Sequence, residues 1–166
     1  MTFVNRQLEA DTSKQDRNLC DKVLLAIINL DEFTLTHPWR RQITFECHSI
    51  CRAISWFIPE LKVIDGRYLG LKTTENGQRF EIYSCTHSWL KTPDGSILDP
   101  YPPGSIGIAP ILVVCKGAYS YFGGNMYVPD PNVARETVSR PEMHRKSLAL
   151  LQLLQASTNR KEKPNN

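Results

Sequence analysis

The chain has 166 residues, 41% of them hydrophobic and 22% charged, and its 20 Lys and Arg against 17 Asp and Glu give a formal net charge of +3. This composition is typical of a globular protein, and the length suits one domain that is large enough to be stable without disulfides or a structural metal. The charge is mild and the basic residues form no cluster with interleaved aromatic residues, which argues against a nucleic-acid-binding protein.

The N-terminal segment lacks the apolar core of a signal peptide, and no apolar run approaches the ~20 residues that a membrane-spanning helix needs. The five cysteines are an odd number and lack the spacing of a small disulfide-linked scaffold. We therefore expect a soluble, reduced, cytoplasmic protein that does not bind membranes. Export by a route that needs no N-terminal signal is the alternative, and the sequence does not indicate an oligomeric state.

Two amphipathic helices are expected in the first part of the chain, after a flexible segment over residues 1–15. Apolar residues recur at three- and four-residue steps over 16–30 and predict the first helix: Leu19, Val23, Ala26, Ile27 and Leu30. A loop rich in helix breakers is expected over 34–39. Residues 45–57 predict a second helix, which Pro59 ends. Because this second helix is apolar on much of its circumference, we expect it to be central in the fold.

Strand-like segments follow the two helices. Residues 61–71 favour a β-strand, within which Asp65 and Gly66 predict a bulge or bend. Residues 79–91 and 96–99 flank a turn-forming Pro-Asp-Gly sequence and predict a β-hairpin. The sheet is therefore expected to be antiparallel.

The rest of the chain predicts one more strand and one more helix. The apolar run over 111–115 favours a buried strand, and residues 142–155 favour a helix. Residues 158–166 are polar and are expected to form a disordered tail. Helices followed by an antiparallel sheet and a final helix predict an α+β fold with a single domain over 16–157.

Cys47 is the first residue that points to chemistry, because it falls where the second helix is expected to begin. The positive end of the helix dipole favours the thiolate form of a cysteine at this position, and the thiolate is the nucleophilic form. The free backbone N–H groups of the first helical turn are also suited to stabilise an oxyanion. A cysteine at a helix start therefore predicts a nucleophile with an oxyanion site beside it.

His87 and Asp99 are the candidates for a base and for the group that orients it. If the Pro-Asp-Gly sequence after Thr92 forms a three-residue loop, Thr92 pairs with Ser96 and Asp99 lies opposite Trp89. His87 is then on the same sheet face as Asp99 and diagonal to it, within reach of its carboxylate. A two-residue loop places Asp99 on the other face. Proline suits the first position of the longer loop and glycine its last, so we expect the register that brings His87 and Asp99 together.

Cys47 at a helix start, His87-Ser88-Trp89, and Ile97-Leu98-Asp99-Pro100 after an Asp-Gly turn together resemble the transglutaminase-like branch of the papain-like fold. This branch has the order Cys, His, Asp in common with transglutaminases, arylamine N-acetyltransferases and small bacterial cysteine proteinases. The resemblance covers residues 47–104, about a third of the chain. It implies a nucleophile at the start of a central helix that packs on an antiparallel sheet. Cys47 is then the nucleophile, His87 the general base and acid, and Asp99 the residue that orients His87.

The resemblance implies a thiol-dependent acyl-transfer enzyme: an amide hydrolase, a peptidase (cysteine protease), a deamidase or a transglutaminase-type acyltransferase that works through an acyl-thioester. Its partner is then a substrate, either a protein, a peptide or a small amide. Such a mechanism requires no cofactor or metal, and no acidic cluster suggests the calcium sites of large transglutaminases. Gln42, shortly before Cys47, is the side-chain candidate for the oxyanion site, in the role of the papain glutamine.

Two other interpretations of the same residues are open. Cys47, Cys51, Cys85 and His87 would together make a Cys₃His structural zinc site. The chain would otherwise be a non-catalytic binding module on the same fold, or a protein whose partner completes the site. The reactivity of the Cys47 thiol discriminates the binding module from the enzyme, because such a module has no need of a thiolate, and metal analysis of the purified protein tests for zinc.

Residues beside the three candidates also have two interpretations each. Trp89 is expected to pack beside the site, with substrate binding as the alternative. His48 points about 100° away from Cys47 around the helix, which favours a surface residue over a competing base. A group of aromatic residues predicts either a substrate-facing loop or a hydrophobic strand or loop edge: Tyr119, Tyr121, Phe122 and Tyr127.

Overall fold

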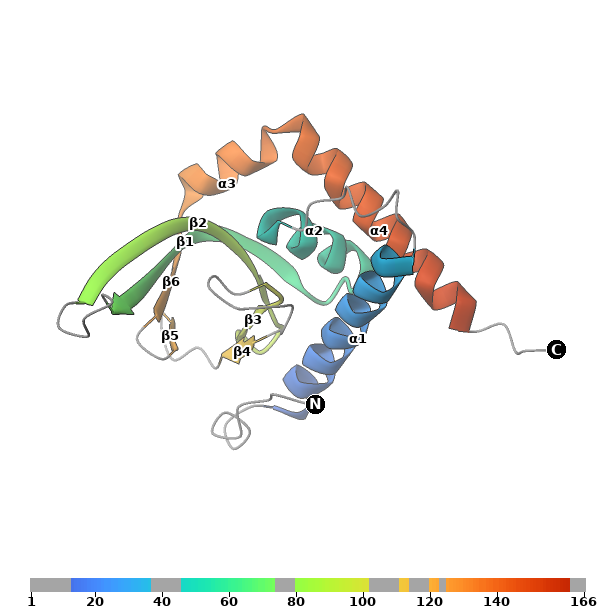
Figure 1. Ribbon diagram of the computed structural model, residues 1–166. Coiled ribbons are helices and arrows are strands. Elements are labelled where there is room, and N and C mark those ends of the chain that lie inside the picture. The colour runs from blue at the N-terminus through green and yellow to red at the C-terminus, as the bar shows by residue number, and fades with distance from the viewer. Residues whose placement is uncertain are drawn as a thin grey trace.

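The structure is a computed structural model, and it describes residues 13–36, 46–73, 80–101, 111–113, 120–122 and 125–161. Within these ranges the chain forms four helices and six strands of an α+β fold, which confirms the predicted class (Figure 1). The elements in chain order are α1 (Lys14–Thr36), α2 (Cys47–Phe57), β1 (Lys62–Thr73), β2 (Phe80–Lys91), β3 (Ile97–Asp99), β4 (Ile111–Val113), β5 (Ser120–Phe122), β6 (Asn125–Pro129), α3 (Pro131–Val138) and α4 (Pro141–Lys161).

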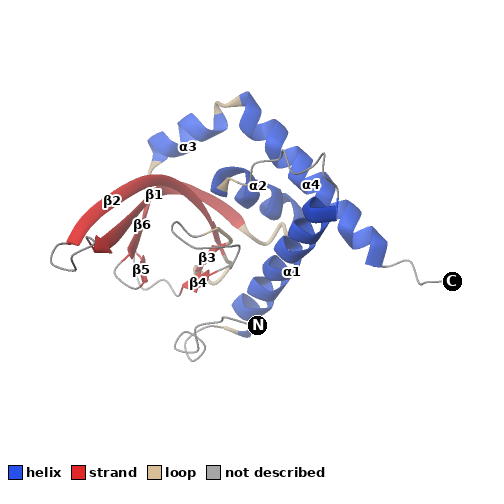
Figure 2. Cartoon of the chain, viewed as in Figure 1, coloured by secondary structure: helices blue, strands red, loops and turns tan. Residues whose placement is uncertain are grey.

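The described strands form one antiparallel sheet in the order β4-β3-β2-β1-β6-β5. Its centre is the β1–β2 pair, whose register runs from Lys62 opposite Lys91 to Thr73 opposite Phe80. This long pair curves strongly, so that the sheet curls away from the helices (Figure 2). Helix α2 packs on β1 and β2 and is covered by α4, while α3 lies over β1 (Figure 1). The expectation that the second helix is central is therefore confirmed.

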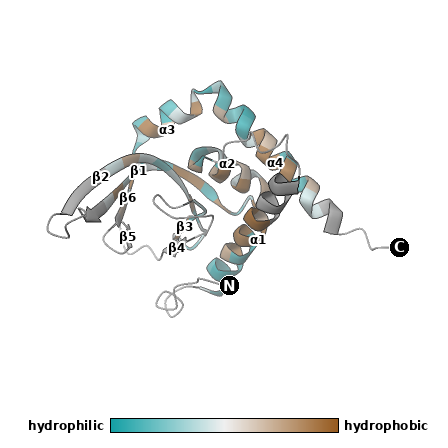
Figure 3. Ribbon diagram, in the orientation of Figure 1, coloured by the Kyte–Doolittle hydropathy of each residue, from teal (hydrophilic) through white to brown (hydrophobic). Residues whose placement is uncertain are grey.

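Two groups of buried side chains pack on opposite faces of the sheet. The cross-strand partners Leu90 and Leu98 face α1, α2 and α4, whose hydrophobic segments meet in the helical part of the molecule (Figure 3). Their neighbours Trp89 and Ile97 belong to the second group, because successive residues of a strand point to opposite faces. Tyr127 of β6 joins this second group. The second group is aromatic, and the candidate site lies beside it.

Of the bulge or bend predicted at Asp65 and Gly66, the bulge is wrong, because the β1–β2 register passes through both residues without a break. A Cβ atom placed on Gly66 would lie 2.1 Å from the backbone oxygen of Val128 and 2.7 Å from the ring of Trp89. Glycine is therefore needed here for close approach of β6 and of the Trp89 ring, which is the other common reason for a glycine inside a strand.

The two long helices extend past their predicted ends. Helix α1 continues to Thr36, into the segment predicted as a loop, because the first proline after the helical pattern is Pro38 and a proline restricts only the residue directly before it. Helix α4 continues to Lys161, so residues 158–161 are helical although a disordered tail is predicted there. Helix α1 likewise begins inside the segment predicted to be flexible.

The part of the chain after β4 contains one helix that the periodicity does not predict. Helix α3 begins after Asp130, whose side chain accepts a hydrogen bond of 2.9 Å from the backbone N–H of Asn132, and Pro131 follows as the first helical residue. An Asp followed by Pro is a common helix start, so the signal for α3 is present in the sequence. For the aromatic segment before it, the strand interpretation is confirmed at Tyr121, Phe122 and Tyr127, which lie in β5 and β6.

Candidate active site

Cys47 is the first residue of α2, as predicted. The residue before it, Glu46, has the extended backbone of a helix N-cap, and its carbonyl accepts the first helical hydrogen bond from the N–H of Ile50 at 3.0 Å. The amides of residues 47–49 therefore precede the hydrogen-bonded part of the helix and point out of its positive end. The side chain of Glu46 pairs with Lys146 of α4 at 2.5 Å, which ties the start of α2 to the last helix.

The turn between β2 and β3 has the register that the sequence predicts. The N–H of Thr92 donates to the carbonyl of Ser96 at 2.9 Å, and Gly95 closes the loop with a φ of 91°. Leu90 is paired with Leu98, so that Asp99, one residue further, is level with Trp89. The three-residue loop is therefore confirmed, and with it the expectation that Asp99 shares the sheet face of the histidine two residues before Trp89.

His87 and Asp99 form a buried pair. The Nε2 atom of His87 lies 2.7 Å from Oδ2 of Asp99, and the two residues are 1% and 0% exposed. The same Oδ2 accepts a hydrogen bond of 2.9 Å from the hydroxyl of Tyr127, and Oδ1 accepts one of 3.0 Å from the N–H of Tyr101. Since Nε2 is bonded to the carboxylate, Nδ1 is the ring nitrogen that is left to meet Cys47.

Trp89 packs beside His87 and does not line an open surface. It is 2% exposed, and its ring stacks on the imidazole with the ring centroids 6.2 Å apart and the planes at 28°. Tyr68 meets the same imidazole edge-on at 5.9 Å, and Tyr127 is tilted against it at 6.2 Å. The aromatic rings restrict the rotation of His87, so the predicted packing role of Trp89 agrees with the structure.

A second buried histidine, His48, lies next to Cys47 in the chain. The Nδ1 atom of His48 is 2.5 Å from the hydroxyl of Ser88, and that hydroxyl donates in turn to Oδ1 of Asp65. Both terminal nitrogens of Arg52 donate hydrogen bonds to the carboxylate of Asp65, at 3.2 and 2.8 Å. Arg52 also donates to the carbonyl of His48 at 3.1 Å. We refer to the set His48, Ser88, Asp65 and Arg52 as the second histidine network.

The expectation that His48 lies on the surface is wrong, because the residue is only 9% exposed. Rotation by about 100° around α2 does carry it away from the direction of Cys47, but β1 and β2 pack on that side of the helix. Ser88 faces α2 from β2, as the hydrogen bond of 3.2 Å from the Cys51 thiol to the Ser88 carbonyl also shows. The face of α2 that carries His48 is therefore covered by the sheet.

The thiol of Cys47 and the two imidazoles change one another's pKa values. Burial alone raises the pKa of Cys47, but hydrogen bonds with His48 and His87 and the charges of both rings more than offset it and lower the pKa from 9.0 to about 6. Burial lowers the pKa of His87, but Asp99 and Cys47 raise it from 6.5 to about 9. The pKa of His48 is raised to about 9, because Asp65 and Cys47 outweigh burial there. At neutral pH the site therefore holds a thiolate beside two imidazolium ions.

Two carboxylates and one arginine balance this cluster. Burial raises the pKa of Asp65, but hydrogen bonds from His48, Arg52 and Ser88 outweigh it, and the net shift is downward. Three anions (Cys47, Asp65, Asp99) then face three cations (His48, Arg52, His87) in the ion pairs and hydrogen bonds of the site. Tyr127 stays a neutral donor to Asp99, since burial and the carboxylate charge raise the pKa of its phenol. The cluster is electrically neutral, which lowers the cost of burying it.

Asp65, Ser88, Arg52 and Tyr127 belong to the site but are not predicted as site residues. Helical spacing gives one signal, because Arg52 lies four residues after His48 and therefore on the same side of α2. Strand pairing gives another, because Asp65 lies opposite Ser88 in the β1–β2 register. That second signal is hidden in the sequence, since Asp65 precedes a glycine and the pair predicts a bulge or bend there.

Two further expectations concern the oxyanion site and a metal. Gln42 lies outside the described residues. The four members of the predicted Cys₃His site are all described, yet nowhere in the described ranges do three or more His, Cys, Asp or Glu residues come together as a group suited to hold a metal ion. The thiol of Cys51 instead donates to the Ser88 carbonyl. The geometry therefore does not favour the structural zinc interpretation.

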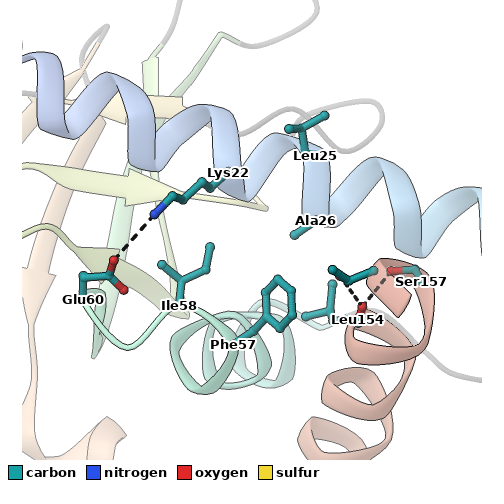
Figure 4. Close-up of a pocket in the computed structure, with 9 residues that line it drawn as sticks. Lys22, Leu25, Ala26, Phe57, Ile58, Glu60, Leu154 and Ser157 are labelled. Carbon is teal, nitrogen blue, oxygen red and sulfur yellow. Dashed lines mark hydrogen bonds and ion pairs between the residues drawn. The ribbon is translucent and has the colours of Figure 1, made fainter. Parts of the chain in front are cut away.

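A cavity of about 450 Å³ lies between α1, α2 and α4, at the other end of α2 from Cys47 (Figure 4). Phe57 and Ile58 line it, and Lys22 pairs with Glu60 beside it at 3.6 Å. The rise of an α-helix separates Phe57 from Cys47 by about 15 Å. This cavity is therefore not part of the candidate active site.

Comparison of the chain with protein-family models, with curated proteins and with solved structures finds no match in any of the three. In the described part of the chain, none of the helices combines the length and the apolar character needed to cross a membrane.

Proposed function

We propose that this chain is a thiol-dependent acyl-transfer enzyme of the transglutaminase-like branch of the papain-like fold, with Cys47 as nucleophile. The observation that carries the proposal is the buried pair of His87 and Asp99, 2.7 Å apart, and the His87 ring helps to lower the pKa of the thiol at the start of α2. The order Cys, His, Asp along the chain and the placement of His87 and Asp99 on neighbouring strands support the same conclusion.

Acylation begins with attack of the Cys47 thiolate on the carbonyl carbon of an ester or amide. The carbonyl oxygen takes up the negative charge, and the N–H of Cys47 at the open end of α2 donates a hydrogen bond to it. His87 then gives its Nδ1 proton to the leaving alcohol or amine while the bond from carbon to that group breaks. The product is a thioester on Cys47 and a neutral imidazole.

Deacylation runs through the same groups in reverse. A water molecule or an amine attacks the thioester and gives its proton to Nδ1 of His87. The C–S bond breaks with its electron pair on sulfur, and the thiolate and imidazolium are restored. Water gives a free acid, as in a hydrolase, peptidase or deamidase, and an amine gives a new amide, as in a transglutaminase-type reaction. The substrate of either reaction is the carbonyl group of a protein, a peptide or a small amide.

Asp99 makes this proton transfer possible by fixing the ring. Its carboxylate holds Nε2, and its own orientation is fixed by donors from Tyr127 and Tyr101. With Nε2 held, Nδ1 is the nitrogen that faces sulfur in every step. A carboxamide in place of Asp99 cannot stabilise the imidazolium in the same way. Asp99 is therefore a positioning residue, and its loss acts through His87.

The test uses p-nitrophenyl acetate as acyl donor, with water or hydroxylamine as acceptor, and detects acetylated Cys47 by intact-mass and peptide mass spectrometry. We expect Cys47→Ala to abolish acetylation of this peptide and turnover, and Asp99→Asn to lower turnover by roughly 10⁴-fold. Cys20→Ala is the matched control, because Cys20 is half-buried on α1 and burial and Asp21 raise its pKa to about 11.

Full turnover by Cys47→Ala would exclude the proposed mechanism. A Cys47 that alkylates rapidly below pH 8 but is never acetylated would favour a site that a partner must complete. Slow alkylation and no acetylation would favour a non-catalytic binding module, because such a module has no need of a thiolate.

A further inference from the structure

The proposed mechanism uses Cys47, His87 and Asp99 and assigns no role to the second histidine network. His48 is buried, and its Nδ1 is occupied by Ser88 at 2.5 Å, within a chain of contacts that continues to Asp65 and Arg52. A histidine that served only to fill the interface between α2 and the sheet would not need a buried carboxylate and a bidentate arginine behind it. A carboxylate therefore supports each histidine: Asp65 supports His48 through Ser88, across β1 and β2, and Asp99 holds His87 directly, across β2 and β3.

The two rings present different nitrogens to Cys47. His87 is held at Nε2 by Asp99, so its Nδ1 faces the sulfur. His48 is held at Nδ1 by Ser88, so its Nε2 is the nitrogen left for the hydrogen bond with Cys47. The charged groups that act on His48 are Cys47 and Arg52 on α2 and Asp65 on β1. Cys51 and Cys85 are also close enough for the charge of Cys47 to help raise their pKa values.

We propose that His48 is a second catalytic residue, whose protonated ring donates a hydrogen bond from Nε2 to the Cys47 sulfur through the whole reaction cycle. The proposal rests on the acyl-transfer function argued above and adds a separate task to it. His87 moves protons, and His48 keeps its proton and stabilises the thiolate whenever the thiolate is present.

The task matters most when the thioester breaks down. His87 is neutral at that stage, because its proton left with the first product. The attacking water or amine gives a proton to Nδ1 of His87, the C–S bond breaks, and its electron pair goes to sulfur. In the proposal, the protonated ring of His48, the next residue after Cys47, donates from Nε2 to this sulfur and stabilises the developing anion. No proton leaves His48, so the step balances without a further donor or acceptor.

The surroundings of His48 favour a fixed donor over a second base. A base must lose its proton during the cycle, but Asp65 lies 3.8 Å from Nδ1 of His48 and stabilises the positive ring. Arg52 holds Asp65 in its ionised form through two hydrogen bonds. The raised pKa of His48 agrees with this geometry. Its charge therefore persists at neutral pH.

The experiment measures the pH dependence of iodoacetamide alkylation at Cys47, resolved from the other cysteines by peptide mass spectrometry. The variants are His48→Gln, His87→Gln and the double variant. His144→Gln is the matched control, because His144 is exposed on α4 and its ring packs edge-on against Trp56. We expect His48→Gln and His87→Gln each to raise the pH midpoint, that is, the pH at which the alkylation rate at Cys47 is half of its maximum. The double variant should raise this midpoint further, to the ordinary cysteine value of about 8.5 or above.

The second readout is the breakdown of acetyl-Cys47, prepared with p-nitrophenyl acetate and followed by intact mass. We expect His48→Gln to slow this step by roughly 10-fold, as for the loss of one hydrogen bond to a charged group. His87→Gln should slow acylation and breakdown far more. A midpoint and a breakdown rate in His48→Gln equal to those of the parent would overturn the role of His48 and leave the proposed function intact.

The opposite pattern would separate the two proposals. If His48→Gln raised the midpoint and slowed turnover while His87→Gln changed neither, the proposed function would fail in its assignment of the base. Ser88→Ala provides a second test should His48→Gln not fold, because it keeps the ring and its ion pair with Asp65 and removes the hydrogen bonds that run from Nδ1 through the Ser88 hydroxyl. We expect a smaller rise of the midpoint in the same direction, and an unchanged midpoint in a folded Ser88→Ala protein would overturn the proposal.

Discussion

A buried ionised side chain persists only where another group stabilises its charge, and each ionised residue of the site has such a partner. The carboxylate of Asp99 compensates the charge of His87, and that of Asp65 faces both His48 and Arg52. The thiolate of Cys47 lies beside the charged rings of His48 and His87. Because these charges sum to zero, no single one is expected to be replaceable without disturbing the others. The chemistry of the site is therefore a property of the cluster, and the pH dependence of activity should show it.

We expect a bell-shaped dependence of kcat/KM on pH. Hydrogen bonds with His48 and His87 lower the pKa of Cys47 to about 6 in the folded protein, so activity is lost as the pH falls through that value and the thiolate is protonated. Asp99 and Cys47 raise the pKa of His87 to about 9, so activity is lost again as the pH rises through that value and the leaving group has no proton donor. Activity should be highest between the two values.

The measurement is initial-rate hydrolysis of p-nitrophenyl acetate between pH 5 and 10, corrected for the uncatalysed reaction. His144→Gln should give the same profile as the parent protein. A single ascending limb near pH 8.5 would contradict the coupling of Cys47 to the two rings, because it is the behaviour of an ordinary thiol.

At the scale of the strand, the close approach of β6 to β1 depends on the missing side chain of Gly66. A methyl group there would lie 2.1 Å from the carbonyl oxygen of Val128, which is backbone and cannot rotate away. We expect Gly66→Ala to lower the free energy of unfolding by roughly 2–4 kcal/mol, as for other cases of overpacking. Because β6 carries Tyr127, a donor to Asp99, activity should fall as well.

The effect is measured by urea unfolding and by turnover of p-nitrophenyl acetate. Thr86→Ala is the control, since Thr86 is exposed on the neighbouring strand β2. A Gly66→Ala protein as stable as the parent would show that β6 can shift without cost, and the glycine would then need another explanation.

The hairpin register could be predicted from the sequence, because the Pro-Asp-Gly turn determines which residues of β2 and β3 share a face. That one inference predicts that His87 and Asp99 lie side by side on one face of the sheet. The contact of Tyr127 with Asp99 could not be predicted, since it depends on β6 pairing with β1 across the sheet. The second histidine network was hidden for the same reason: local spacing places His48 and Arg52 on α2 but says nothing of which strands cover them.

The whole molecule forms the candidate site from parts that are far apart in the chain. Cys47 and His48 belong to a helix, while Asp65, His87 and Asp99 belong to three strands of the sheet. The packing of α2 on β1 and β2 is what brings these groups within hydrogen-bonding distance. The low pKa of the Cys47 thiol is therefore a property of the folded state, and it should disappear when the sheet and helices separate.

Unfolding should change the alkylation of two cysteines of α2 in opposite directions. In the folded protein at pH 6, about half of the Cys47 thiols are ionised. The unfolded chain would ionise well under 1% of them. The greater intrinsic nucleophilicity of a more basic thiolate offsets part of this difference, so we expect the rate at Cys47 to fall by about 10-fold. Cys51, one turn further, is 0% exposed, and burial together with the charge of Asp99 raises its pKa, so unfolding should increase its rate.

The measurement is alkylation of both peptides by iodoacetamide at pH 6 across a urea gradient, with global unfolding followed by tryptophan fluorescence. The rates at Cys47 and Cys51 should cross over at the same urea concentration as the fluorescence transition, since one cooperative unfolding event separates α2 from the sheet. A rise at both residues would mean that Cys47 is no more ionised in the folded protein than in the unfolded chain. That result would contradict both the ionised state of Cys47 in the folded protein and the charge balance of the whole site.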